Sequence, residues 1–97
     1  MVTRSIVDIL RTGQPDEAVT IQGWVRTKRE LKGFAFIEVN DGSSMANLQV
    51  VLNLELPDYD ALLKQLNTGA SVGVAGVLVP SQGKGQRIEL KATTLKI

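Results

Sequence analysis

Two aromatic rings stand two positions apart in a segment of alternating residues. In residues 34–40 (FAFIEVN) the aliphatic residues fall on one side of an extended chain, which places Phe34 and Phe36 on the other side. Aromatic rings on the exposed face of a strand can stack on the bases of a single-stranded nucleic acid. A ring can instead pack beneath a neighbouring turn, and this alternative stays open, above all for Phe34.

Four basic residues precede the rings within a short stretch, namely Arg26, Lys28, Arg29 and Lys32. Guanidinium and ammonium groups bind phosphate oxygens through charge-assisted hydrogen bonds. The whole chain has 11 Lys and Arg against 10 Asp and Glu, so its net charge of +1 does not by itself indicate a nucleic-acid binder. The hypothesis depends on the local cluster, and a solvated hairpin tip is the alternative.

Gln49 falls in the outward register of a further predicted strand, where its amide could offer a donor and an acceptor to a base edge beside Phe36. An outward glutamine that serves only solubility is the alternative. Asp41 is interpreted as a turn residue, and Glu38 and Glu89 as surface carboxylates.

The segment 81–87 (SQGKGQR) contains two glycines, Gly83 and Gly85, which would let the backbone approach a ligand. This segment lacks the upstream glycine and the following helix of a phosphate-binding P-loop. We therefore interpret it as a ligand-facing loop between two strands.

The composition excludes several kinds of chemistry. The chain has 97 residues with no Cys and no His, so it lacks the thiolate and imidazole groups of zinc sites, iron–sulfur clusters, His-based triads and cysteine nucleophiles. A chain of this length hides about 60–65% of its surface on folding, which leaves little room for a large catalytic cleft. No stretch approaches the ~20 apolar residues of a membrane span. We expect a single soluble, cytoplasmic domain over residues 1–97.

Hydrophobic periodicity predicts the elements that position these residues. A period of two predicts a strand from Ala18 through the basic cluster, then strands around 34–40, 48–53, 71–78 and 88–97. Gly23 inside the first strand indicates a bulge or a sharp coil, which a small barrel requires where one strand serves two sheets. The residues expected to face inward are Val19, Ile21, Gly23, Val25, Ala35, Ile37, Val39, Leu48, Val50, Leu52, Val72, Val74, Gly76, Leu78, Ile88, Leu90, Leu95 and Ile97.

Two short helices are predicted beside the strands. Ser5 followed by Asp8 is typical of a helix start, and Gly13 ends the helix, so residues 1–15 form an N-terminal capping helix and turn. Apolar residues at helical spacing over 59–66 predict a second helix between the third and fourth strands.

Five strands with a helix between the third and fourth follow the order of an OB-fold. This fold is a partly open, five-stranded Greek-key barrel that binds nucleic acid or oligosaccharide across strands two and three and the flanking loops. We therefore predict an all-β OB-fold barrel over residues 18–97, with the capping helix in front of it.

A series of motifs along the chain resembles a known family, the N-terminal anticodon-binding domain of class IIb aminoacyl-tRNA synthetases, most of all in bacterial asparaginyl-tRNA synthetases. The resemblance covers residues 6–97. Its motifs are VTIQGWVRTKR at 19–29, FIEVNDG at 36–42, LQVV at 48–51, LPDY at 56–59, TGASV at 68–72 and GQRIE at 85–89.

The resemblance implies roles for individual residues. It implies that Phe36 stacks on the central anticodon base, a uridine in asparagine tRNA, that Gln49 hydrogen-bonds this uridine, and that Arg29 contacts the anticodon. The other residues that we assign to the nucleic-acid-binding face are Arg26 and Lys28 at phosphates, Phe34, and, near the third anticodon base, Gln82, Lys84 and Gln86.

The resemblance also implies the partner and the division of labour. The expected partner is the anticodon loop of a tRNA with the anticodon GUU, although aspartate enzymes share this barrel. In the family, a separate C-terminal domain binds ATP and magnesium and aminoacylates the tRNA as part of a homodimer. We expect the present chain to be a monomer without catalytic residue, metal or cofactor.

Two other readings of the same chain stay open. It could be a free-standing paralogue that binds single-stranded nucleic acid in general. It could also be a protein-interaction barrel that uses the face of Phe34 and Phe36.

Overall fold

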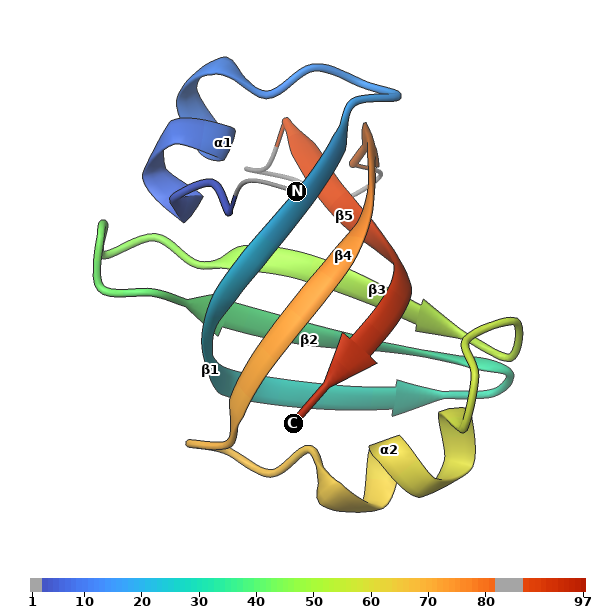
Figure 1. Cartoon of the computed structure of the whole chain (residues 1–97). Helices are drawn as coiled ribbons and strands as arrows, with labels where there is room; N and C mark the ends of the chain where they lie inside the picture. The colour runs from blue at the N-terminus through green and yellow to red at the C-terminus, as the bar shows by residue number, and fades with distance from the viewer. Residues whose placement is uncertain (1–2, 82–86) are drawn as a thin grey trace.

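The computed structural model describes residues 3–81 and 87–97 and forms a closed barrel of five strands in the order β1-β2-β3-β5-β4 (Figure 1). Its strands are β1 (Ala18–Leu31), β2 (Phe34–Asn40), β3 (Leu48–Asn53), β4 (Ser71–Pro80) and β5 (Ile88–Lys96), and its helices are α1 (Ile6–Thr12) and α2 (Tyr59–Gln65). Neighbouring strands are antiparallel except β3 and β5, which run parallel. The predicted OB-fold, with a helix between the third and fourth strands, is confirmed.

Strand β1 serves two ladders, as its composition predicts. Residues 18–24 pair with β4 and residues 24–31 pair with β2, so Trp24 takes part in both. At Gly23 a Cβ atom would lie 2.4 Å from the backbone oxygen of Asn40, a distance that only glycine tolerates. The sharp coil expected at Gly23 is therefore present, whereas the bulge lies further along, where Arg26 is the extra residue.

The bulge decides which side chains of β1 reach the outer face. Beyond it, Arg29 lies opposite Phe36, and Lys28 lies opposite the buried Ile37. Directly opposed residues of an antiparallel pair share a face of the sheet. Arg29 therefore shares the outer face with Phe36, while Lys28 is turned toward the end of the barrel.

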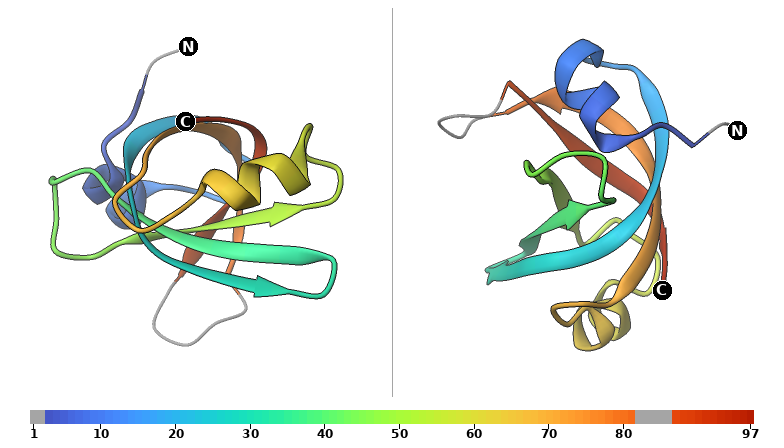
Figure 2. Two further views of the ribbon diagram at one scale, coloured as in Figure 1. Left: turned by 90° about the horizontal axis from the view of Figure 1, so that it is seen from below. Right: turned by 90° about the vertical axis from the view of Figure 1, so that its left-hand side faces the viewer.

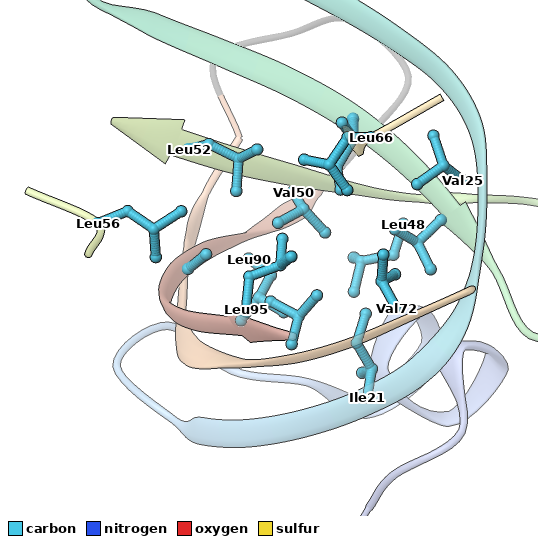
Figure 3. Close-up of a cluster of buried hydrophobic side chains, with 14 of the residues drawn as sticks. Ile21, Val25, Leu48, Val50, Leu52, Leu56, Leu66, Val72, Leu90 and Leu95 are labelled. Atoms are coloured by element: carbon cyan, nitrogen blue, oxygen red, sulfur yellow. The ribbon is translucent and has the colours of Figure 1, made fainter. Parts of the chain in front are cut away.

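The inward-facing residues of the five strands form the core, part of which Figure 3 shows. Most of the aliphatic residues predicted to face inward are buried. Ile97 is an exception, because it lies beyond β5 and is 51% exposed. A register shift opposite Ala75 and Gly76 makes Thr93 an extra residue of β5, so that both Ala92 and Leu95 are buried.

Helices α1 and α2 cover opposite ends of the barrel (Figures 1 and 2). Helix α1 begins at the predicted cap, since the Ser5 hydroxyl accepts a hydrogen bond from the Asp8 N–H at 3.3 Å. Its buried residues Ile6 and Ile9 join the core. Neither helix is long and apolar enough to cross a membrane, within the part of the chain that the structure describes.

Two side chains from the barrel hold α1 in place. The Asp41 carboxylate accepts a hydrogen bond from the backbone N–H of Ile6 at 2.8 Å, so this residue does more than make a turn. The Arg87 guanidinium donates to the backbone oxygen of Gly13 at 2.6 Å, just beyond the last turn of α1. The barrel thus satisfies polar groups at both helix ends, where intrahelical partners are missing.

Candidate nucleic-acid interface

An open groove of about 560 Å³ crosses the outer face of β1, β2 and β3. It brings together four residues that the sequence nominates, namely Lys28 and Arg29 of β1, Phe36 of β2 and Gln49 of β3. The full lining is Thr27, Lys28, Arg29, Phe36, Glu38, Gln49 and Glu89. The groove therefore combines an aromatic ring, an amide, a guanidinium, a lysine side chain, a hydroxyl and two carboxylates.

The two phenylalanines form a pair on the outer face of β2. Their ring centroids lie 5.3 Å apart and their planes meet at 87°, an edge-to-face arrangement. Phe36 is half-buried and lines the groove, while Phe34 is 37% exposed beside it. Phe34 thus contacts Phe36, and the neighbouring ring restricts how Phe36 can turn.

Gln49 is held by a carboxylate from another strand. Its Nε2 donates to Oε2 of Glu89 over 2.6 Å. Glu89 is only 7% exposed, so its interpretation as a surface carboxylate is wrong. The cause is the parallel pairing of β3 and β5, in which Val50 lies opposite Leu90 and the two preceding residues meet on the outer face.

Glu38, the other carboxylate of the groove, is half-buried and lies opposite Gln49 in the ladder between β2 and β3. It accepts a hydrogen bond from the Thr27 hydroxyl at 2.8 Å. The two carboxylates therefore have different partners, and Glu89 is the one that bonds the Gln49 amide.

Two arginines are available for phosphate oxygens. Within the described part of the chain, the side chains of Arg26 and Arg29 form no hydrogen bond or ion pair with another residue, and both residues are exposed. Arg29 lines the groove. Arg26 lies in a separate hollow of about 270 Å³ at the loop between β2 and β3, lined also by Asn40, Ser44, Met45 and Asn47.

The Lys28 ammonium has a different environment. It donates to the backbone oxygen of Leu63 in α2 at 2.8 Å, and it lies 4.0 Å from the Glu30 carboxylate. The structure therefore holds this ammonium against α2, although the Lys28 side chain also lines the groove beside Arg29. Its assignment to a phosphate rests on its place in the basic cluster and stays a prediction.

The remaining predicted residues, Gln82, Lys84 and Gln86, lie outside the described residues. Three residues of the groove lining, Thr27, Glu38 and Glu89, are not among the residues nominated from the sequence. Glu89 is the one that bonds Gln49. Its outward register in β5 is visible in the alternation, but its proximity to Gln49 depends on the pairing of two strands that are 40 residues apart.

Curated relatives match the chain over nearly its whole length. It is 74% identical over 97 residues to an asparagine–tRNA ligase of Nostoc sp. strain PCC 7120, and 62% identical over 96 residues to that of Microcystis aeruginosa. These matches cover 100% and 99% of the chain but 21% of each relative. The chain thus spans about one fifth of the length of the curated relatives that it matches.

Solved structures match the fold. The asparaginyl-tRNA synthetase of Pyrococcus horikoshii, in complex with asparaginyl-adenylate, superposes with a TM-score of 0.84 at 17% identity, over 100% of this chain and 22% of that one. The family model described as an OB-fold nucleic acid binding domain of the tRNA anticodon type matches residues 19–97. The chain therefore belongs to the family of OB-fold nucleic acid binding domains.

Proposed function

We propose that the chain is the anticodon-binding module of an asparaginyl-tRNA synthetase and that it binds the anticodon loop of asparagine tRNA, with the anticodon GUU. The observation that carries this proposal is the meeting of Phe36, Gln49 and Arg29 in one groove. The names of the relatives, asparagine–tRNA ligases at up to 74% identity, support the choice of tRNA.

In this proposal the central uridine stacks on Phe36, and the Gln49 amide hydrogen-bonds its edge. Single-stranded loops are recognised in this way because their unpaired bases can turn outward onto aromatic side chains. Arg29 binds a phosphate beside the stacked base. Arg26 of β1 lies beside the C-terminal end of β2, whereas Phe34 is at the N-terminal end of that strand. Arg26 can therefore bind the backbone of an adjoining nucleotide.

In this proposal, aminoacylation takes place in the part of each relative that the present chain does not match, about four fifths of its length. We propose that ATP and magnesium bind there, and that the present chain contributes affinity and specificity without a catalytic residue or a cofactor. We further propose that the complete enzyme is a cytoplasmic homodimer, whereas this module alone is a monomer.

Competition between tRNA transcripts tests the proposal. A labelled asparagine tRNA is displaced by unlabelled transcripts that keep the same body and carry either the GUU anticodon or three replaced anticodon bases. The proposal predicts that the GUU transcript competes at least about ten-fold better, since each correct base contact is worth roughly this much. Equal competition, equal displacement by single-stranded DNA, or no binding would contradict it.

A further inference from the structure

The Gln49 side chain can lie in the groove with its amide in either of two orientations. A glutamine amide has two N–H donors at one end and a carbonyl oxygen at the other. Rotation by 180° about the last side-chain bond exchanges the two ends with little change of shape. An unrestrained glutamine can therefore offer a base either order of donor and acceptor.

Glu89 removes this freedom. Its carboxylate can only accept hydrogen bonds when ionised, so the end of Gln49 that faces it has to be the NH₂ group. The contact between Nε2 and Oε2 is 2.6 Å, and Glu89 is 7% exposed, which shields this contact from competing water. A rotated amide would place two oxygens against each other inside this shielded contact.

The order of donor and acceptor is what distinguishes the two pyrimidines. Uracil offers the O4 acceptor next to the N3–H donor, whereas cytosine offers the N4–H donor next to the N3 acceptor. An amide held in one orientation beside a stacked ring can match one of these orders and opposes the other. A freely rotating amide can match both.

We infer that Glu89 is a positioning residue that holds the Gln49 amide in one orientation and thereby makes the groove select uracil over cytosine. This inference rests on the proposed function, which places a uridine on Phe36. The Gln49 N–H that is not bound to Glu89 donates to a uracil carbonyl oxygen, and the Gln49 oxygen accepts the N3–H. Glu38 has no such role, because the structure gives it Thr27 as its partner.

The test measures the ratio of affinities for two RNA hairpins that differ in the central anticodon base, U or C. The substitution is Glu89→Gln, which keeps the shape of the side chain and can either accept from Gln49 or donate to it. We expect the wild-type chain to prefer U by roughly ten-fold or more. In Glu89→Gln this preference should fall below about one third of its wild-type value, chiefly because the C hairpin binds better.

Glu38→Gln is the matched control, since it removes the same charge from the same groove. Both variants should bind both hairpins somewhat more tightly, because one negative charge near the phosphates is gone. The ratio of affinities should fall in Glu89→Gln and stay at the wild-type value in Glu38→Gln. An unchanged ratio in Glu89→Gln overturns the inference while the proposed function stands. A wild-type chain that does not distinguish the hairpins contradicts the proposed function itself.

A second measurement on the free protein does not depend on RNA. The side-chain NH₂ group of Gln49, assigned by its loss in Gln49→Ala, gives two proton resonances in a ¹⁵N correlation spectrum. With Glu89 as acceptor, one of them should lie downfield of ordinary glutamine values and move back in Glu89→Leu. Resonances of ordinary position in the wild-type chain would show an unrestrained amide and overturn the inference.

Discussion

The rings of Phe34 and Phe36 meet edge to face, with centroids 5.3 Å apart, on the outer face of β2. Because the two residues are two positions apart on one strand, the backbone itself holds the rings at this separation. Phe34 supports the orientation of Phe36, and Phe36 lines the groove together with Gln49 and Arg29. The exposed Phe34 and the half-buried Phe36 therefore form one aromatic surface beside the groove.

Replacement of Phe36 by Ala should weaken binding of an anticodon-loop hairpin by about 1–3 kcal/mol, the usual contribution of one stacked base. Phe36→Tyr keeps an aromatic face and should bind nearly as well as the wild-type chain. Phe34→Ala should cost less, because Phe34 acts on the base through Phe36. Fluorescence anisotropy with a labelled hairpin measures all three. Unchanged affinity in Phe36→Ala would show that the base stacks elsewhere.

Arg29 and Lys28 are neighbours in sequence with different expected effects on RNA binding. Arg29→Met should lower affinity for all sequences and reduce the slope of log K against log salt by about 0.7, the value for one phosphate on a single strand. Lys28→Met should leave this slope unchanged. It should instead lower the free energy of unfolding by about 0.5–1.5 kcal/mol, because the hydrogen bond to the Leu63 oxygen is lost.

These two variants are compared by titrations at several salt concentrations and by urea unfolding. The distinction between them would be refuted if Lys28→Met reduced the salt slope as much as Arg29→Met does. Such a result would mean that the Lys28 ammonium leaves α2 and binds a phosphate.

Asp41 couples the stability of α1 to pH. Burial disfavours its charge, but hydrogen bonds from Ser43 and from the Ile6 N–H outweigh burial and hold the pKa of Asp41 below its ordinary value of 3.8. The folded chain then binds fewer protons than the unfolded chain in this range. The contribution of Asp41 is therefore complete above pH 3.8 and is lost as pH falls through the lower, folded pKa.

We expect Asp41→Asn to lower the free energy of unfolding at pH 7 by about 0.5–1.5 kcal/mol. The amide has one acceptor oxygen where the carboxylate has two, so the bond from Ile6 or the bonds from Ser43 are lost. The variant should also lose less stability than the wild-type chain between pH 4 and pH 2. Part of the acid dependence should remain, because hydrogen bonds from Arg4 and Thr12 lower the pKa of Asp8 as well. Urea unfolding at several pH values measures this, and parallel pH profiles of variant and wild type would contradict the expectation.

Two glycines of β4 provide a matched test of barrel closure. A Cβ atom at Gly76 would lie 2.1 Å from the backbone oxygen of Lys91 in β5, whereas nothing lies within 4 Å of a Cβ atom at Gly73. Gly76→Ala should therefore lower the free energy of unfolding by about 1–3 kcal/mol or more, since backbone must move. Gly73→Ala should be neutral or stabilise slightly. Thermal unfolding measures the stability of the two variants. Equal stability would show that β4 and β5 do not approach each other as closely at Gly76 as the structure indicates.

Much of the barrel could be predicted because alternation in a small closed sheet is strict. One side of each strand must be aliphatic, as residues 34–40 and 48–53 show, and a one-residue shift would bury polar groups. The bulge in β1 marks the limit of this reasoning. It inserts Arg26 without any change in the pattern of residue types, and it turns Lys28 away from the face on which simple alternation places it.

The candidate site could be predicted in part for the same reason. Phe36 and Gln49 lie on adjacent strands of a meander, so their proximity follows from local hairpin geometry. Glu89 approaches Gln49 through the parallel pairing of β3 with β5, and two strands that far apart in sequence have no local signal for their register. The contact between Glu89 and Gln49 is therefore visible only in the three-dimensional structure.

One titration shows whether the groove binds an anticodon base through Gln49. Wild-type chain and Gln49→Ala are each titrated with RNA hairpins that carry the anticodons GUU and GCU, at two salt concentrations. We expect the wild-type chain to prefer the GUU hairpin at both salt concentrations and Gln49→Ala to lose this preference. Equal binding of both hairpins by the wild-type chain, with affinity that depends on salt alone, would show that Gln49 does not select the base.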